Sequence, residues 1–190
     1  MNSGKWYFEV YLVDAGSFGI GVMSATAPIS GQLGATESAW YRANGYKYPN
    51  ETSYGSAASD GDIIGCLFDV DTGVIEFLKN NTSMGTLGSG YNILNTWNDN
   101  VLAAVKTYDS NEHGIVNFGQ DSSFVGNKTS GSANAADAKG LGKFYYQPPT
   151  GALSLCTQNI PEPAVSIAQS DSPNKHFIAL RWGIYSSTAS

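Results

Sequence analysis

Apolar and polar residues alternate along much of the chain in short runs, as they do in strands that bury one face. In the first run, residues 5–13, one face carries Trp6, Phe8, Val10 and Leu12, and the other carries Tyr7, Glu9 and Tyr11. Further strand-like runs occupy residues 18–23, 40–50, 62–70, 73–80, 101–108 and 114–120. Gly, Asn, Asp and Pro separate the runs, and none has helical periodicity over the ~11 residues of an average helix. The pattern predicts an all-β protein, an antiparallel two-sheet β-sandwich.

Two short stretches predict the turns of hairpins. Asn44-Gly45 lies between aromatic residues, which is the strongest short-range signal of a hairpin. The stretch from Asp69 to Gly73 lies between two apolar runs, and with Glu76 it allows three interpretations: a calcium loop, a pair of catalytic carboxylates, or a hairpin corner. A calcium loop needs further spaced oxygen ligands, and catalytic carboxylates must face each other across a cleft. Because the chain returns directly to an apolar strand after Gly73, the hairpin corner is the favoured interpretation.

The composition is poor in charge. Charged residues make up 14% of the sequence, against about 25% in typical soluble domains, and the net charge is −6. The 10 Lys and Arg residues are scattered, so they form no basic patch for nucleic acid. No apolar segment approaches the ~20 residues that cross a bilayer, and residues 1–10 lack the layout of a signal peptide. We therefore expect neither nucleic-acid binding nor membrane insertion.

Residues capable of catalysis or metal binding are few. Cys66 lies inside an apolar run, which predicts a buried, unreactive thiol, and Cys156 is isolated from it in the sequence. Neither His113 nor His176 lies in a motif that supports a catalytic triad. Without a His/Cys cluster or opposed carboxylates, the sequence predicts no enzymatic activity, no cofactor and no metal site.

The second half of the chain differs in composition from the first. We predict a sandwich over residues 1–147, in which low-complexity residues 120–142 form a mobile insertion. Residues 148–190 are rich in proline, which suppresses helix, so they predict an extended strap or the start of a further module. The strap carries apolar side chains that need burial, among them Phe177, Ile178, Leu180 and Trp182. We expect these residues to attach the domain to a neighbouring subunit.

Several motifs occur in an order that resembles a SPRY domain. They are SGKWYFEV, GIGV, YRANGYKYPN followed by YG, DGDIIGCLFDVDTGVIEFLKNN, MGT, LAAVKTY and VNFGQ, and together they span residues 3–120. Where that family often has Asn-Gly after the second strand of the hairpin, this chain has Asn80-Asn81, and Asn also tolerates a left-handed backbone. The stretch FYYQPPTGALSLCTQNIPEP resembles the segment that follows SPRY-like modules in bacteriophage structural proteins.

The resemblance implies a binding module whose loops at one end of the sandwich grip a partner. Tyr, Trp and Arg dominate binding hot spots, and Asn adds adaptable hydrogen bonds. The expected binding surface consists of Trp40, Tyr41, Arg42, Tyr46, Tyr48, Tyr91, Trp97 and Asn98. For Trp40 and for Tyr54, packing into the core beneath the loops is the alternative interpretation.

Two functions follow from this resemblance. The first is a non-enzymatic virion module, such as a fibre, tail or capsid-decoration protein, located on the surface of an extracellular particle. Its partners would be other virion proteins or copies of itself in a homo-oligomer, and its loops would recognise a protein or glycan of the host surface. The low charge and the bacteriophage-like tail favour this function. The second is a cellular SPRY adaptor that binds a short peptide of a partner protein.

The alternation around Gly73 predicts that Phe68 and Phe77 face the core. Phe77→Ala should therefore lower the free energy of unfolding by about 3–5 kcal/mol, because it removes a large buried side chain and leaves a cavity. Denaturant titration measures this change, with Glu76→Ala, at the neighbouring outward position, as the control. A loss under about 1 kcal/mol for Phe77→Ala would place that side chain outside the core.

Overall fold

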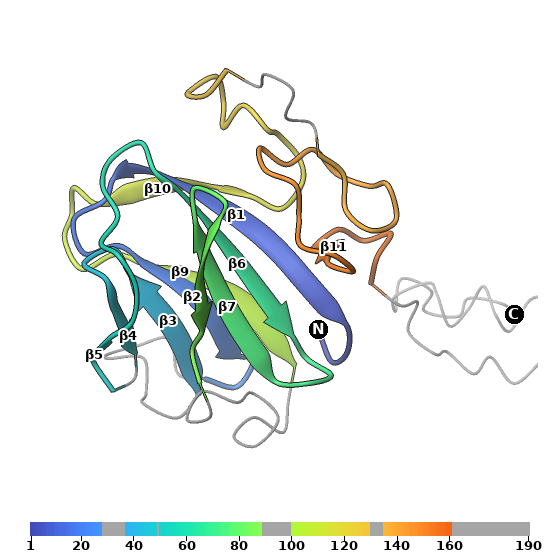
Figure 1. Cartoon of the computed structure of the whole chain (residues 1–190), viewed down its shortest axis with the longest axis horizontal. Coiled ribbons are helices and arrows are strands. Elements are labelled where there is room, and N and C mark those ends of the chain that lie inside the picture. The colour runs from blue at the N-terminus through green and yellow to red at the C-terminus, as the bar shows by residue number, and fades with distance from the viewer. Residues whose placement is uncertain (28–36, 49, 89–99, 130–134, 161–190) are drawn as a thin grey trace, which may run out of the picture. The chain divides into compact units, whose positions relative to one another are not determined.

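The computed structural model describes residues 1–27, 37–48, 50–88, 100–129 and 135–160, and these form two stacked sheets (Figure 1). The six-stranded sheet has the order β10 (His113–Asn117), β1 (Lys5–Asp14), β6 (Ile63–Asp69), β7 (Val74–Lys79) and β8 (Thr82–Thr86), with β11 (Leu153–Ser154) parallel to β1. The five-stranded sheet has the order β5 (Thr52–Ser53), β4 (Tyr46–Tyr48), β3 (Ser38–Arg42), β2 (Gly19–Ser24) and β9 (Val101–Lys106). All pairs except β1–β11 are antiparallel, and the described residues contain no helix. The predicted all-β sandwich is confirmed.

The core between the sheets is built from the alternation seen in the sequence. One face of β1 contributes Trp6, Phe8, Val10 and Leu12, all buried. Phe68 and Phe77 are fully buried in the same cluster, as predicted. Cys66 lies beside them in β6, and its complete burial raises the pKa of the thiol well above its ordinary value. The thiol therefore stays protonated at neutral pH and acts as a small apolar side chain.

The acidic stretch between β6 and β7 is the corner of a hairpin. The Asp69 carboxylate accepts hydrogen bonds from the N–H groups of Asp71 (2.9 Å) and Thr72 (3.2 Å), while Gly73 adopts a φ of 74°. The Asp71 carboxylate accepts a hydrogen bond from the N–H of Gly4 at 3.0 Å. Both carboxylates thus satisfy backbone donors of turns, which confirms the hairpin interpretation.

The other two predicted turns also form hairpins. Asn80 and Asn81 join β7 to β8 with φ angles of 47° and 67°, the left-handed conformation that Asn tolerates better than most residues. Gly45, between β3 and β4, has a φ of 90°, and its N–H donates to the Arg42 carbonyl at 2.9 Å. Local turn chemistry therefore sets the register of the strands around both sites.

The chain after β10 packs against the outer face of the six-stranded sheet, beside β1 (Figure 1). A second buried cluster joins this segment to β1, β6 and β7, and it consists of Tyr7, Leu67, Leu78, Phe144 and Ala152. Phe124 is also buried, with its ring 5.7 Å from that of Tyr11. The sequence predicts a mobile insertion over residues 120–142, whereas the described parts of that range make packed contacts with the sheet. The physical reason is that the outward face of β1 carries the large aromatic rings of Tyr7 and Tyr11, which this segment covers.

The carboxylate of Glu9, in the middle of β1, fixes this covering segment. It is fully buried and accepts hydrogen bonds from the N–H groups of Tyr145 (2.9 Å) and Tyr146 (2.8 Å). The Tyr7 hydroxyl (3.2 Å) and the Asn117 amide (3.3 Å) donate to the same carboxylate. Burial raises the pKa of Glu9, and the hydrogen bonds partly oppose that effect. A buried carboxylate needs such partners on both oxygens.

Asp137 is a second buried carboxylate and lies inside the covering segment. It accepts hydrogen bonds from the N–H (2.9 Å) and hydroxyl (2.7 Å) of Ser154, from the Asn159 amide (2.6 Å), and from the N–H groups of Lys139 (2.8 Å) and Leu141 (2.9 Å). Despite an opposing effect of desolvation, these donors lower the pKa of Asp137 to about 2. One side chain thus connects residues 137–141 to β11 and Asn159.

The lowered pKa of Asp137 predicts how stability depends on pH. The unfolded chain binds this proton near pH 3.9, and the folded chain near pH 2, so the stabilisation is complete above about pH 4 and is lost as pH falls towards 2. Asp137→Asn should therefore lower the free energy of unfolding by about 2 kcal/mol at pH 6, and by much less at pH 2.5. Urea titrations at both pH values measure the difference. Asp109→Asn, at an exposed side chain, is the control, and an Asp137→Asn deficit that does not depend on pH would contradict the prediction.

Candidate binding surface

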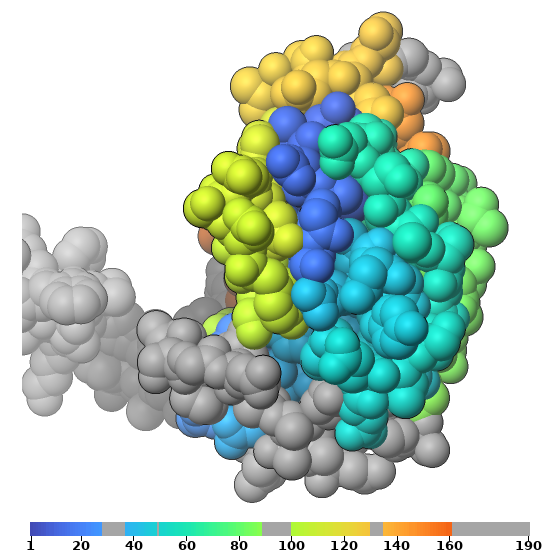
Figure 2. Space-filling view, turned by 90° about the vertical axis from the view of Figure 1, so that its left-hand side faces the viewer, coloured from blue at the N-terminus to red at the C-terminus, as the bar shows by residue number. Residues whose placement is uncertain are grey.

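The outer face of the five-stranded sheet carries four of the residues that the sequence predicts for binding. Successive residues of a strand point to opposite faces, and Tyr41 points into the core, so Trp40 and Arg42 of β3 point outward. Trp40 is paired with Tyr48, which places Tyr48 and Tyr46 of β4 on the same outer face. Near Arg42, the turn after β1, strands β3–β4 and the chain after β9 meet on one side of the molecule (Figure 2).

Two of the predicted binding residues are not available at this surface. Tyr41 is fully buried in the core, and its hydroxyl donates to the Ser56 carbonyl at 2.8 Å, so its assignment to the binding surface is wrong. The error arises because alternation in β3 turns Tyr41 to the face opposite its neighbours. Trp40 is only 5% exposed, which agrees with the alternative interpretation that it is packed.

Arg42 is the centre of the surface that remains. Its guanidinium donates from Nη1 to the Tyr48 hydroxyl (3.0 Å) and from Nε to the Ser17 carbonyl (3.3 Å). The same group lies 4.1 Å from the ring centroid of Tyr108, and the Lys106 ammonium lies 4.3 Å from that centroid. Both distances are typical of cation–π contacts. We call Arg42, Tyr46, Tyr48, Lys106 and Tyr108 the Arg42 surface.

Glu112 holds the neighbours of Arg42 in place. It is buried, and its carboxylate accepts hydrogen bonds from the N–H groups of Tyr108 (2.6 Å) and Asp109 (3.3 Å) and from the N–H of Ser17. Two of these residues, Ser17 and Tyr108, contact the Arg42 guanidinium directly. The β1–β2 turn and the chain after β9 are thus tied to one carboxylate beside the candidate site.

The sequence analysis missed Lys106, Tyr108 and Glu112. The two-residue period of β9 places Leu102, Ala104 and Lys106 on one face, and this signal is visible in the sequence. The sequence does not reveal that β9 pairs with β2. This pairing places Lys106 opposite Gly19, whose other partner is Arg42, so the two cations flank the same glycine.

The Arg42 surface can bind a partner but offers no evident acid–base chemistry. Burial raises the pKa values of Tyr48 and Tyr108, so both hydroxyls stay neutral and able to donate hydrogen bonds at neutral pH. Tyr46 is 41% exposed and Tyr108 is 43% exposed, which leaves aromatic area for contact. In the described ranges no three His, Cys, Asp or Glu side chains are grouped so that they could hold a metal ion. No helix in those ranges is long and apolar enough to span a membrane.

Other predicted site residues lie outside the described parts of the chain. These are Tyr91, Trp97 and Asn98 of the expected binding loops, and Phe177, Ile178, Leu180 and Trp182 of the expected assembly tail. Tyr54, considered alongside them, is half-buried and packs against the core, and its hydroxyl donates to the Gly85 carbonyl.

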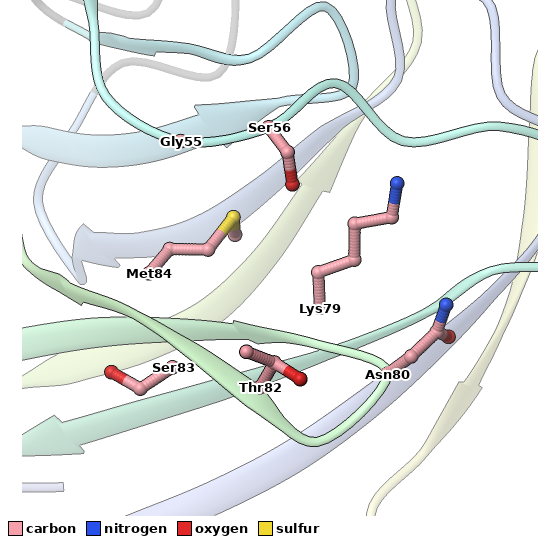
Figure 3. A pocket seen from close by; sticks show the side chains of 7 residues that line it. All are labelled: Gly55, Ser56, Lys79, Asn80, Thr82, Ser83 and Met84. Carbon is pink, nitrogen blue, oxygen red and sulfur yellow. The ribbon is translucent and has the colours of Figure 1, made fainter.

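A pocket of about 480 Å³ lies near the β7–β8 hairpin, and its lining residues are Gly55, Ser56, Lys79, Asn80, Thr82, Ser83 and Met84 (Figure 3). Its charged group is already paired, because the Lys79 ammonium donates to the Ala57 carbonyl at 2.5 Å and lies 3.1 Å from the Asp62 carboxylate. The Asn80 amide donates to the same Asp62 carboxylate at 2.6 Å. The Arg42 surface, where aromatic rings and cations remain partly exposed, is the stronger candidate.

Comparison with known proteins agrees with this fold. A family model described as "SPRY domain" matches residues 5–121, which is more than half of the chain. The chain belongs to the SPRY family. The crystal structure of the SPRY domain of human HERC1 is similar to this SPRY domain, with 23% identity over 61% of this chain and 74% of that chain and a TM-score of 0.50. A crystal structure of a human SPRY domain has 24% identity over 61% of this chain and 86% of that chain, with a TM-score of 0.49.

Family membership sets the general class of function. SPRY domains are in general non-catalytic modules that bind protein partners. The family match ends at residue 121, so the covering segment described over residues 135–160 lies beyond it.

Proposed function

We propose that this SPRY domain is a non-catalytic module that recognises a protein segment through the Arg42 surface. The observation that carries the proposal is the position of Arg42 against the Tyr108 ring, beside the partly exposed Tyr46. Arg and Tyr are enriched among the residues that dominate binding energy, and a tyrosine loses little conformational entropy when it binds. The six-stranded sheet, by contrast, is covered around Tyr7, Leu67 and Leu78 by the chain's own residues 135–160.

For its biological setting we propose a virion structural protein, such as a fibre, tail or capsid-decoration component. The low charge of the chain and the resemblance of its tail to bacteriophage structural proteins support this setting. Its partners would then be other virion proteins or copies of itself, and the Arg42 surface would contact a host-surface protein or glycan. A cellular adaptor that binds a short peptide is the alternative, and membership of a family of protein-binding modules supports it equally.

Peptide display tests the proposed surface without knowledge of the natural partner. A library of random dodecapeptides is selected on the full chain, and the affinities of the selected peptides are measured by fluorescence anisotropy. Tyr46→Ser and Tyr108→Ser should each weaken binding by about tenfold or more, as is typical of hot-spot residues. Val74→Ser, at an exposed apolar residue of the six-stranded sheet, is the matched control and should leave binding unchanged. Failure to select any peptide, or equal binding by all three variants, would contradict the proposal.

The virion setting makes a separate prediction about the tail. Residues up to Ile160 belong to one compact unit, and Ser154 and Asn159 take part in its buried hydrogen bonds. A chain ending at Ile160 should therefore keep the melting temperature of the full chain. If the assembly tail works as proposed, the full chain should elute as an oligomer in size-exclusion chromatography and the shortened chain as a monomer. A monomeric full chain, or a shortened chain that still assembles, would contradict the role of the tail.

A further inference from the structure

We infer that the protein segment bound at the Arg42 surface carries an acidic side chain, whose carboxylate replaces that of Glu51 beside Arg42. This inference rests on the proposed function of the Arg42 surface and names the chemistry of its partner. It is carried by the placement of two cations on the outer face and by the internal ion pair that one of them makes.

The two cations lie on the same face of the sheet, and the strand position between their backbones is a glycine. Gly19 of β2 is paired with Arg42 on one side and with Lys106 on the other. Two strand spacings put the backbones of these cations about 10 Å apart. Both charged groups contact the same Tyr108 ring, with the cations 4.1 and 4.3 Å from its centroid. The chain as a whole has a net charge of −6, yet two cations lie around one ring here. This local positive charge favours binding of an anionic group from a partner.

Glu51 occupies the anion position, where its carboxylate also interacts with the Tyr48 hydroxyl. Its carboxylate lies 3.8 Å from Nη1 of Arg42, and its side chain is 61% exposed. The Arg42 side chain is 18% exposed, so solvent screens this pair mainly from the side of Glu51. Glu51 also has a φ of 38°, a left-handed conformation that costs a non-glycine residue about 1–2 kcal/mol. An incoming carboxylate would therefore compete with Glu51 for Arg42 and for the Tyr48 hydroxyl.

Arg42 keeps donors available for such a carboxylate. A guanidinium has five N–H donors, and the hydrogen bonds to Ser17 and Tyr48 within the described residues use Nε and one on Nη1. Its planar geometry suits a bidentate contact with a carboxylate. The Tyr48 hydroxyl beside it, which stays neutral, adds a further polar group at the same place.

Nearby acidic residues limit how much negative charge the partner carries. Glu112 is buried behind the site and is offset by three N–H donors. Asp109 is exposed near Tyr108 and accepts from the Asn111 N–H at 3.2 Å. Together with Glu51, these carboxylates would repel a run of acidic residues. We therefore expect one Asp or Glu flanked by neutral or apolar residues, which would lie against Tyr46 and Tyr108.

The dodecapeptide selection tests the inference when it is repeated on variants of the full chain. Peptides selected on the natural sequence should be enriched in a single Asp or Glu. Changing that residue to Asn or Gln should weaken binding by about tenfold, and Lys106→Gln and Arg42→Gln should each do the same. Glu51→Gln should strengthen binding about two- to fivefold, because it removes the competing carboxylate. Peptide binding to the natural sequence should also weaken as the salt concentration rises from about 50 to about 300 mM. Over this range the screening length falls by more than half, which weakens attraction between charges.

Three outcomes separate this inference from the proposed function. If the selected peptides lose affinity with Tyr46→Ser but show no acidic enrichment and no response to Glu51→Gln, the inference is wrong and the proposed surface stands. If Glu51→Gln weakens binding, Glu51 supports the site rather than competing for it, and the inference is wrong. If no peptide is selected and a sialylated oligosaccharide binds instead, the inference and the proposed recognition of a protein segment are both wrong, and the glycan alternative of the virion setting is supported. Arg42 also donates a hydrogen bond to Ser17, so a thermal melt must show that the Arg42→Gln variant is folded. Lys106→Gln tests the charge requirement without removing that hydrogen bond.

Discussion

A carboxylate enclosed by protein must receive hydrogen bonds on both of its oxygens, and much of this structure depends on how Glu9 meets that requirement. Glu9 lies in β1, the strand between β10 and β6, and points to the face opposite the main core. Two of its donors are the N–H groups of Tyr145 and Tyr146, more than a hundred residues away in the sequence. These bonds hold Phe144 against Tyr7, with ring centroids 5.3 Å apart. The hydrogen bonds to Glu9, together with the packing of Tyr7 against Phe144, therefore bury the second face of β1.

This arrangement gives the two sheets different roles. The outer face of the six-stranded sheet is partly occupied by residues 135–160, held by Glu9 and Asp137 and by the cluster around Phe144. The five-stranded sheet instead presents Tyr46 and Tyr108, each about two-fifths exposed, around the cationic Arg42. The covering segment lies beyond the matched SPRY residues, so it is an addition to the family's sandwich in this chain. It leaves the outer face of the opposite sheet for the recognition that we propose.

Local patterns were enough to predict the sandwich, the turn at Gly73 and the left-handed Asn80-Asn81 pair, because each depends on neighbouring residues. The site was predicted only in part. Arg42 was found from its aromatic neighbours, whereas Tyr108 was missed, because its position depends on the pairing of β9 with β2. The packing of the segment after β10 was not predicted because its composition is simple. Its order comes from a few residues, such as Asp137, whose partners are distant in the sequence.

The Arg42 surface is also rigid, and this bears on how it binds. Arg42 lies at the end of β3, Lys106 at the end of β9, and Tyr108 directly follows it, so regular strands set the backbone of the cations. Glu112 then fixes the chain on either side of the guanidinium, through Ser17 and Tyr108. A surface held in this way loses little conformational entropy when a partner docks, so more of the contact energy is available as affinity. The proposed binding would require the Glu51 side chain to move, since its carboxylate lies 3.8 Å from Nη1 of Arg42. Selectivity at this surface would then arise from competition between an internal and an external carboxylate for one prearranged arginine.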